Sequence, residues 1–386
     1  MTPGARVAAA IAVIDTMNDG LAAEQALTRW ARGSRYAGSK DRAAVRDHVF
    51  DVLRVRRTAE ALGRGTTGRA MMIGALRHAG ADLGALFDGQ GHAPAPLSEE
   101  EAQAPDAPDD MPTRWNLPDW LLPEFTRSLG DDAEGTALAM QTRAPICLRV
   151  NTAKTDVATA QEALASEGIE TQLNDLADGA LTVIEGARKI RNSFAFANGW
   201  VELQDAASQA VVAACPSGGR VLDYCAGGGG KALALAMDPG RHVFAHDIDP
   251  RRMTDLPARA ERAGASITTL PTADLADHAP YDLVLCDAPC SGSGAWRRSP
   301  DGKWALTGER LAELTAIQDE ILTDALRLVA PGGVLAYATC SVLACENEDR
   351  IAAFLEAHAD WRCSFERRFD VGPQGDGFYT AHLTRD

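Results

Sequence analysis

The C-terminal half of this 386-residue chain is predicted to form an α/β domain with a mostly parallel sheet covered by helices on both faces. Three observations predict it. Short β-branched runs alternate with helical segments from about residue 201, four glycines follow the run RVLDYCA, and an apolar stripe at helical spacing runs from Leu311 to Leu328. We expect the sequence PGG at 331–333 to end that last helix.

Three regions are expected before this domain. Residues 1–95 form an all-helical domain, because apolar residues recur at helical spacing in RVAAAIAVIDTM, AAEQALTRWA, DRAAVRDHVFDVLRVRRTAEAL and RAMMIGALRHAG. Residues 96–112 are a linker rich in Pro, Ala and acid, which buries too little apolar surface to offset its ordering entropy. Residues 113–200 form a small α+β subdomain, with ICLRVNT and LTVIEG as strands around the helix VATAQEALASEG, and the α/β domain spans 201–386.

Composition excludes several classes of protein. The chain is 46% hydrophobic and 24% charged, which is typical of a globular protein. It has no apolar run of about 18 residues, and its N-terminus lacks the basic region of a secretory signal, so we expect a cytoplasmic protein that does not bind membranes. Its eight cysteines include no C-x-x-C pair, which indicates neither a disulfide framework nor a metal site.

The net charge of −16 argues against a protein that grips a polyanion. This charge is unevenly distributed, however. Residues 1–95 carry thirteen Lys or Arg against nine Asp or Glu, whereas residues 98–110 carry six acids and no base. Local basic surface is therefore expected in the helical domain, although a solvated helix face with i,i+4 ion pairs explains the same arginines equally well.

The sequence VLDYCAGGGGK at 221–231 places a glycine turn between a strand and a helix. Glycines let the backbone approach a ligand, and the helix start offers free N–H groups. Asp247 lies 24 residues after Asp223, at the end of the next strand, where a carboxylate accepts hydrogen bonds from ribose hydroxyls. A nucleotide-like cofactor is expected, and the spacing does not separate NAD, FAD and S-adenosylmethionine.

Two cysteine motifs, DAPCSGSG at 287–294 and ATCS at 338–341, each follow a predicted strand. In an open α/β sheet these positions meet at the ligand-binding rim. Each cysteine alone is most simply an inert buried thiol, but two at one rim indicate chemistry. A thiolate that adds to carbon-6 of a pyrimidine makes carbon-5 nucleophilic, a second thiol aids release, and Asp287 can hydrogen-bond the ring. These patterns do not separate the roles of Cys290 and Cys340.

With these motifs the sequence resembles the RsmB-type branch of the Sun/Nop family of RNA cytosine carbon-5 methyltransferases. The resemblance extends through LRVNT at 148–152, VELQDAASQ at 201–209, HDIDPRRM at 246–253, DAPCSGSGAWRRSPDGKW at 287–304, PGGVLAYATCSVLACEN at 331–347 and GDGFYTAHLTR at 375–385. It implies a Rossmann-like class I core that uses S-adenosyl-L-methionine to methylate ribosomal RNA, specifically 16S rRNA of the small subunit.

The resemblance also implies individual roles. Cys340 is the nucleophile, Cys290 assists release of the methylated base, and Asp287 lies at the reacting end. Asp247 binds the ribose and Asp274 lies near the adenine. The remaining cofactor-binding positions are Cys225, Ala226, Gly227, Gly228, Gly229, Gly230, Lys231 and Arg252. Family members commonly have CAAPGGK where this chain has CAGGGGK, so we expect a softer cofactor loop.

The run SKDRAAVRDHVFDVLRVRR at 39–57 resembles the NusB-like RNA-binding domain that precedes the core in this branch. It implies that the N-terminal helices contact phosphates and position the RNA without reading its sequence. The expected RNA-binding residues are Arg42, Arg46, Arg54, Arg56 and Arg57, together with Arg297, Arg298 and Lys303 near the active site. The protein is expected to act as a monomer.

Two other functions stay open from the sequence. A non-catalytic RNA-binding assembly factor would keep the fold without the chemistry, and the altered glycine loop is the feature that favours it. A methyltransferase acting on tRNA, another RNA or DNA would share the core, whereas methylation of an exocyclic amine would not require a cysteine nucleophile.

Overall fold

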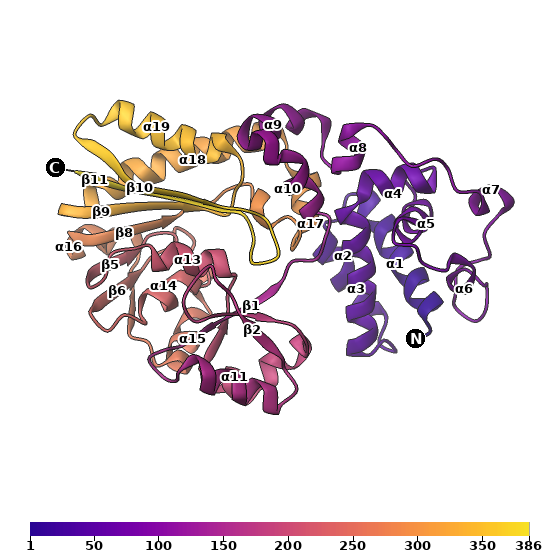
Figure 1. Ribbon diagram of the computed structural model, residues 1–386, viewed down its shortest axis with the longest axis horizontal. Helices are drawn as coiled ribbons and strands as arrows, with labels where there is room; N and C mark the ends of the chain where they lie inside the picture. Colours follow the sequence, from indigo (N-terminus) through magenta and orange to yellow (C-terminus); the bar gives the residue numbers. More distant parts are fainter. Residues whose placement is uncertain (386) are drawn as a thin grey trace. The chain divides into compact units, whose positions relative to one another are not determined.

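The computed structural model describes residues 1–385, which form two compact units (Figure 1). The helical unit comprises residues 1–123, 131–143 and 296–306, and the sheet unit comprises residues 124–130, 144–295 and 307–386. These units differ from the expected domains, because the boundary at residue 95 disappears and residues 296–306 leave the α/β domain.

The core of the helical unit is formed by five helices, which pack around buried aliphatic side chains such as Val13, Val49 and Met72. Their bounds are α1 Pro3–Asn18, α2 Ala23–Gly33, α3 Ser39–Arg54, α4 Arg56–Gly63 and α5 Gly68–His78. The expected single helix over 41–62 is broken at Val55 into α3 and α4. Helical periodicity continues across this break, so the pattern of apolar residues does not reveal it.

The acidic segment at 96–112 contains more structure than a linker. Ser98 and Glu101 form a capping box at the start of α7 (Glu99–Ala102). Arg69 on α5 then binds Glu101 with an Nε–Oε1 distance of 2.7 Å. Helices α6 (Leu83–Leu86) and α8 (Met111–Trp115) flank this segment. Capping, the ion pairs of Arg69 with Glu101 and of Arg64 with Glu100, and the packing of Leu97 against the helical core order this segment.

Residues 296–306 pack against α3 of the helical unit through α17 (Pro300–Ala305). The Trp304 indole Nε1 donates a hydrogen bond of 2.8 Å to the carbonyl of Leu53, and the ring packs against the helical core. This segment follows the DAPCSGSG motif directly in sequence.

The sheet unit contains a small antiparallel sheet with strand order β2-β3-β1-β4. Its strands are β1 Ile146–Val150, β2 Thr171–Leu173, β3 Ala180–Val183 and β4 Val201–Leu203. Helices α11 (Val157–Ser166) and α12 (Phe194–Ala197) contribute to its core with Leu164 and Phe196. A small α+β subdomain is present as the sequence predicted, but its sheet extends beyond residue 200 to Leu203, and residues 113–123 and 131–143 belong to the helical unit.

The large sheet has strand order β10-β11-β9-β8-β5-β6-β7. Its strands are β5 Gly219–Asp223, β6 Arg241–Ala245, β7 Ile267–Thr269, β8 Tyr281–Asp287, β9 Val329–Thr339, β10 Trp361–Phe369 and β11 Phe378–Arg385. Strands β5 to β9 pair in parallel, whereas β11 pairs antiparallel with β9 and β10. The chain passes from β5 to β6 on one side and later to β8 on the other, which places a topological switch point between β5 and β8.

Helices cover both faces of the large sheet (Figure 1). One face carries α13 (Ala206–Ala213), α14 (Gly230–Leu235) and α15 (Leu256–Ala263), and the other carries α16 (Leu275–His278), α18 (Gly308–Ala325) and α19 (Glu348–Ala357). Neighbours alternate along each strand, so Val221 packs on the first face and Leu222 on the second. The predicted α/β fold with a mostly parallel sheet is confirmed. The long helix ends earlier than expected, with Leu326–Leu328 as a separate 3-10 turn.

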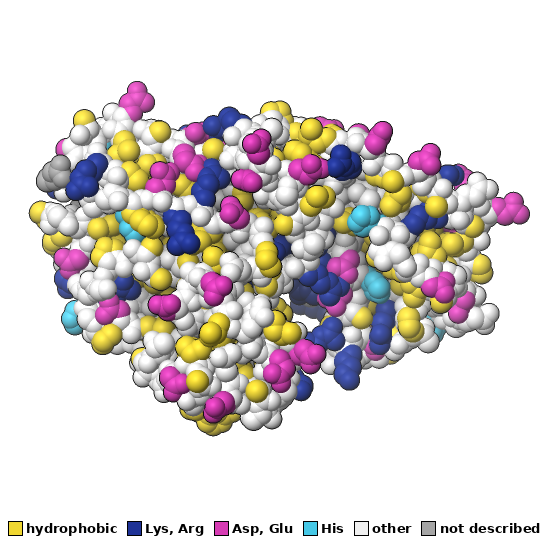
Figure 2. Space-filling view, viewed as in Figure 1, with side chains coloured by type: hydrophobic (Ala, Val, Ile, Leu, Met, Phe, Trp, Pro, Cys, Tyr) yellow, Lys and Arg dark blue, Asp and Glu magenta, His cyan; other side chains and the backbone are white. Residues whose placement is uncertain are grey.

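Acidic and basic side chains are interspersed over the surface shown in Figure 2. Many of them form exposed ion pairs, such as Arg310 with Glu313 and Arg114 with Glu134. Over residues 1–385, no helix combines the length and apolar character needed to cross a membrane.

Candidate active site

The thiols of Cys290 and Cys340 lie 3.5 Å apart at the carboxyl edge of the large sheet. Cys290 follows β8 and Cys340 follows β9, and these neighbouring parallel strands pair Asp287 with Ala338. The backbone N–H of Gly294 donates a 2.9 Å hydrogen bond to the carbonyl of Cys340, which joins the two loops. Residues fifty positions apart in sequence therefore form one dithiol site.

The Cys290 thiol has an altered proton affinity. The hydrogen bond with Cys340 and burial raise the pKa of Cys290 well above its ordinary value. Either sulfur can be the donor in this contact. The geometry joins the two thiols in one site, and their separate roles stay a prediction from the resemblance.

A buried ion pair lies beside the thiols. Lys231 on α14 contacts Asp287 at the end of β8, with an Nζ–Oδ2 distance of 2.7 Å, and its ammonium lies 5.1 Å from the ring centre of Phe378. Burial by itself would lower the pKa of Lys231, but the charge of Asp287 and its hydrogen bond outweigh burial and raise it. Lys231 is therefore a buried cation that is paired with Asp287 at this edge of the sheet.

A buried carboxylate holds the two cysteine loops together. Glu346 is fully buried, and its Oε1 accepts the backbone N–H of Ser291 at 2.7 Å while its Oε2 accepts the hydroxyl of Ser341 at 2.5 Å. The Ser291 hydroxyl also donates to Glu346. Gln318 on α18 donates to the same carboxylate at 3.2 Å and to the carbonyl of Pro289 at 2.9 Å. Each thiol is thus followed by a serine bound to one common acid.

Sequence reasoning missed Glu346 as a site residue. It lies in the quoted stretch ACEN, but an acid in a polar turn is most often solvated, and nothing in its spacing indicates that it reaches residue 291. Only an acidic residue within a mainly apolar run, PGGVLAYATCSVLACEN, could have indicated a buried carboxylate.

The glycine turn connects β5 to α14 at the switch point. Gly229 begins α14 with φ of +81°, and a Cβ there would lie 2.3 Å from Leu256, so only glycine fits. The backbone N–H of Gly227 donates to Asp247 Oδ2 at 2.9 Å, and Arg252 donates to the same oxygen at 2.9 Å. Asp247 therefore orders the loop from the next strand, in addition to its expected role toward a ribose.

The remaining residues predicted to bind the cofactor lie around the same turn. The backbone N–H of Ala226 donates a hydrogen bond of 2.8 Å to the carbonyl of His246, which follows β6. This bond fixes the turn against the end of β6. Burial raises the pKa of Cys225 well above its ordinary value, so this residue is a thiol. Asp274 is exposed and ends a 3-10 turn after β7, while Gly228 and Gly230 complete the loop before Lys231.

The site contains a buried polar group that fits a cationic ligand group. Asp223 at the end of β5 is fully buried, and within residues 1–385 neither of its carboxylate oxygens has a hydrogen-bond partner. Burial, followed by the negative charge of Asp287, raises the pKa of Asp223 to about 7. A buried carboxylate without a donor is costly. An ammonium group of a ligand at the glycine turn would satisfy it, so the residues fit an amino-acid-bearing cofactor.

The raised pKa of Asp223 predicts a pH dependence of stability. Between its ordinary value near 3.8 and about 7, the folded protein holds a proton that the unfolded chain releases, so this residue makes the unfolding free energy fall as pH rises. Asp223→Asn should therefore become more stable relative to wild type from pH 4 to pH 8. Urea unfolding at several pH values measures this, with the exposed Asp277→Asn as control. Parallel profiles for Asp223→Asn and wild type would contradict the assignment.

Three of the predicted RNA-binding residues are buried, and we no longer assign them phosphate contacts. Arg54, Arg297 and Lys303 are 7%, 2% and 1% exposed. Arg54 Nε donates to the Arg297 carbonyl at 2.8 Å, and Lys303 Nζ lies 3.4 Å from the Arg54 carbonyl. Burial, assisted by the charge of Arg54, lowers the pKa of Lys303 to about 7. These side chains hold residues 296–306 to α3, where their sequence pattern suggested a basic surface.

The other predicted RNA-binding arginines are partly engaged. Arg46 pairs with Glu24 at 2.5 Å, Arg56 with Glu60 at 2.9 Å and Arg57 with Asp119 at 2.6 Å. Arg42 donates to the carbonyl of Ala37 at 3.0 Å, and Arg298 is half-buried. Their assignment to RNA stays a prediction, as does the NusB-like character of this region.

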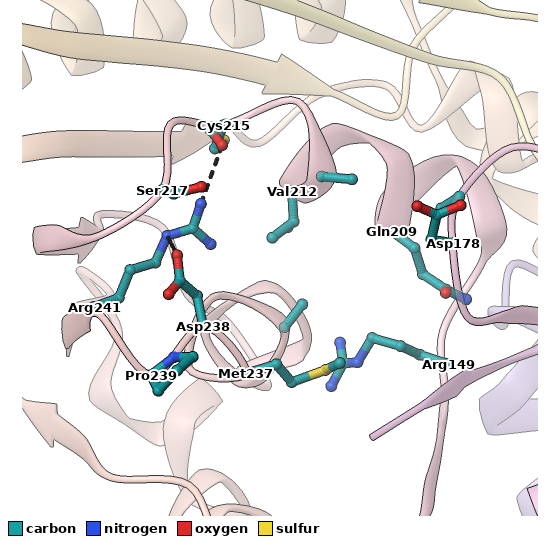
Figure 3. Close-up of a pocket in the computed structure, with 13 residues that line it drawn as sticks. Arg149, Asp178, Gln209, Val212, Cys215, Ser217, Met237, Asp238, Pro239 and Arg241 are labelled. Carbon is teal, nitrogen blue, oxygen red and sulfur yellow. Dashed lines mark hydrogen bonds and ion pairs between the residues drawn. The ribbon is translucent and has the colours of Figure 1, made fainter. Parts of the chain in front are cut away.

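A separate pocket of about 430 Å³ lies on the α13–α14 face of the sheet unit (Figure 3). The guanidinium of Arg149 and the amide of Gln209 line one end, and Arg241, which pairs with Asp238 at 3.4 Å, lines the other. The pocket is lined by residues other than those predicted for catalysis, cofactor or RNA. It is distinct from the dithiol site.

Comparison with known proteins first defines the class. A solved structure of a methyltransferase homologue from Pyrococcus horikoshii has the same fold, with a TM-score of 0.62 and 23% identity over 71% of this chain and 97% of that one. This likeness shows the fold, an open α/β sheet of mostly parallel strands.

The family follows from sequence matches. Residues 210–383 match the model of the 16S rRNA methyltransferase RsmB/F family, and residues 117–190 match its ferredoxin-like domain. The chain is 34% identical over 271 residues to the probable ribosomal RNA small subunit methyltransferase B of Bacillus subtilis, covering 67% of this chain and 60% of that protein. It is 32% identical over 283 residues to the methyltransferase B of Proteus mirabilis, covering 71% and 67%.

The chain belongs to the RsmB/F methyltransferase family, which confirms the resemblance found in the sequence. The matches span about half to two thirds of the length of these curated relatives. The family model covers the glycine turn, both cysteine motifs and Glu346.

Proposed function

We propose that this protein methylates carbon-5 of a cytosine in ribosomal RNA, specifically 16S rRNA, with S-adenosyl-L-methionine as methyl donor. The observation that carries the proposal is the dithiol site, with 3.5 Å between the sulfurs of Cys290 and Cys340 beside the Lys231–Asp287 pair. Membership of the RsmB/F family and a fold shared with methyltransferases support the reaction class. A thiol nucleophile specifically supports attack on a pyrimidine carbon.

The cofactor would be held by the glycine turn from Cys225 to Lys231 and by the carboxylates that surround it. Asp247 and Arg252 would bind the ribose side, Asp274 the adenine side and Asp223 the amino group. When bound, S-adenosyl-L-methionine supplies an electrophilic methyl group. The buried Asp223 carboxylate without a donor is the feature of this structure that supports such a ligand.

In the proposed reaction the Cys340 thiolate forms a bond to carbon-6 of the target cytosine, which must leave its stack to enter the site. The electron pair displaced from the ring makes carbon-5 nucleophilic. Asp287 hydrogen-bonds the base, while Lys231 holds the Asp287 carboxylate in place at 2.7 Å and compensates the negative charge at the site. Carbon-5 then takes the methyl group.

Release of the product requires loss of the carbon-5 proton and of the Cys340 sulfur. The Cys290 thiol has a raised pKa because of the hydrogen bond with Cys340 and burial. Once Cys340 is bonded to carbon, it no longer presents a negative sulfur, so Cys290 can release its own proton to solvent and, as a thiolate, accept the carbon-5 proton. The electron pair of the broken C–H bond then re-forms the ring double bond and expels the Cys340 thiolate.

The direct test is transfer of a labelled methyl group from S-adenosyl-L-methionine to 16S rRNA, followed by mapping of 5-methylcytosine. Wild-type protein should label cytosine carbon-5 at one position. Binding of RNA with no transfer at saturating cofactor would establish the assembly-factor alternative, and label on tRNA alone would assign a different substrate.

We also propose that the enzyme acts as a monomer in the cytoplasm, where its proposed substrate is made. Light scattering on the purified full chain, with and without rRNA, tests the monomeric state.

The replacement of Ala-Pro by Gly-Gly in the cofactor loop leads to a prediction for Gly228. Its N–H makes no hydrogen bond within residues 1–385, and the residue is exposed, so proline removes no contact there. Gly228→Pro should raise the unfolding free energy by about 0.5 kcal/mol by restricting the unfolded chain. It should also tighten binding of S-adenosylhomocysteine about twofold by calorimetric titration. Unchanged affinity would show that the loop is already ordered.

A further inference from the structure

The helical unit carries a group of basic side chains that make no interaction with the rest of the protein. Arg29, Arg32, Arg35 and Lys40 are exposed and have no hydrogen bond, ion pair or ring contact within residues 1–385. Arg191 is the only other Lys or Arg of those residues in this state. Nearly all the uncommitted positive charge of a protein with net charge −16 thus lies in twelve residues.

Local acids do not neutralise this group. No Asp or Glu occurs between residues 25 and 40. Of the two flanking acids, Glu24 is paired with Arg46 at 2.5 Å and Asp41 with Arg6 at 2.8 Å and with the N-terminal amine at 3.2 Å. The four side chains therefore present unopposed positive charge to solvent, where it attracts a counterion atmosphere or a polyanion.

The same surface has a concave part and an exposed aromatic ring. Arg29 and Arg32 lie one turn apart on α2 and border an open hollow of about 510 Å³. Its other lining residues are Leu21, Gln25, Thr28 and Glu24, whose carboxylate is paired with Arg46. Tyr36, in the turn between α2 and α3, is 73% exposed. Figure 2 shows several dark blue side chains over the part of the helical unit that α2 and α3 occupy.

We propose that Arg29, Arg32, Arg35, Tyr36 and Lys40 form an RNA-docking surface, referred to below as the α2–α3 surface. The inference rests on the proposed function, because it assigns where the proposed substrate is held. Four cationic side chains without partners can contact phosphates, which does not require one exact spacing. A solvent-exposed tyrosine provides a face on which an unpaired base stacks. This surface differs from the residues that the sequence pattern indicated, most of which are buried or ion-paired.

An acidic protein partner would use the same charges but has no base to stack on Tyr36. The aromatic ring is thus the feature that favours RNA with unpaired nucleotides over an acidic polypeptide. Substitutions at Tyr36 separate the two partners, because its contribution is independent of charge.

The test uses the full chain, a labelled single-stranded RNA of 20 nucleotides, a duplex RNA of equal length and poly-L-glutamate. The variant Arg29→Gln/Arg32→Gln/Arg35→Gln/Lys40→Gln should weaken RNA binding about 30-fold. It should also reduce the slope of log Kd against log salt by about 3, since each lost contact with a single strand removes roughly 0.7. The matched control Arg64→Gln/Arg114→Gln/Arg310→Gln/Arg327→Gln neutralises four paired, exposed arginines and should change Kd less than about threefold.

The second arm concerns the ring. Tyr36→Leu should weaken binding of the single strand about tenfold and of the duplex hardly at all, while Tyr36→Phe should bind like wild type. Unfolding midpoints of all variants should equal that of wild type, because every substituted side chain is exposed. Equal loss of RNA affinity in the matched control, or tight poly-L-glutamate binding with no effect of Tyr36→Leu on RNA, would overturn the proposal.

Methyl transfer to rRNA distinguishes this inference from the proposed function. An unchanged RNA affinity of the fourfold variant, together with active wild-type enzyme, would overturn the docking surface alone. Wild-type protein that binds RNA through the α2–α3 surface but transfers no methyl group would overturn the reaction alone.

Discussion

Cys340→Ala should abolish methyl transfer, with a loss of at least about 10⁴-fold, and should form no covalent adduct with RNA, because it lacks the sulfur that bonds to carbon-6. Cys290→Ala should instead trap an adduct that survives a denaturing gel, because the base that accepts the carbon-5 proton is gone. The structural basis is the 3.5 Å contact between the two sulfurs, which places the Cys290 thiol next to the adduct that Cys340 would form.

The experiment incubates each variant with 16S rRNA and labelled cofactor and follows both transfer and gel mobility. Cys363→Ala, at a half-exposed thiol on β10, is the control for loss of a cysteine as such and should behave like wild type. An adduct with Cys340→Ala and none with Cys290→Ala would reverse the two roles. The absence of an adduct in both, with transfer retained, would rule out covalent catalysis.

Glu346→Ala should lower the unfolding free energy by about 3 kcal/mol and slow methyl transfer about 100-fold. Removal of this buried carboxylate leaves the Ser291 N–H without an acceptor and takes one acceptor from the Ser291 and Ser341 hydroxyls and from the Gln318 amide, which still donates to the Pro289 carbonyl. A buried unpaired group costs roughly 1–3 kcal/mol. The loops that carry the thiols would then separate, and misplacement of about 1 Å costs on the order of 10² in rate.

Glu346→Gln keeps the size and one acceptor oxygen, so it should lose about half as much stability and retain measurable activity. Formation of a Cys290–Cys340 disulfide on treatment with diamide provides a readout separate from activity, since it requires the sulfurs to stay near 3.5 Å apart. It should be slower in Glu346→Ala than in wild type. Equal rates, or a stability within about 0.5 kcal/mol of wild type, would contradict a positioning role.

The ion pairs explain how an acidic protein can still bind a polyanion. Most basic side chains are held by acids or carbonyls, as in Arg127 with Glu124 and Asp349. They contribute little to attraction of a polyanion. A docking surface for a polyanion requires cations that have no such partners. The net charge of the whole chain does not indicate how many cations of this kind there are or where they lie.

The sequence by itself determined the order of elements, the mostly parallel sheet and the rim at which both cysteine motifs lie. These follow from local rules, since apolar periodicity, glycine turns and strand ends are encoded by neighbouring residues. The position of Cys290 and Cys340 at one edge follows in turn from parallel pairing of β8 with β9, which the alternation of strands and helices implies.

Tertiary structure alone decided which polar residues are buried and what they contact. The break at Val55, the burial of Arg297 and Lys303 against α3, and the reach of Glu346 to Ser291 each depend on segments far apart in sequence. A charged residue has the same local pattern whether it is solvated or enclosed. Only packing fixes the difference, and the raised pKa values of Cys290 and Asp223 are consequences of it.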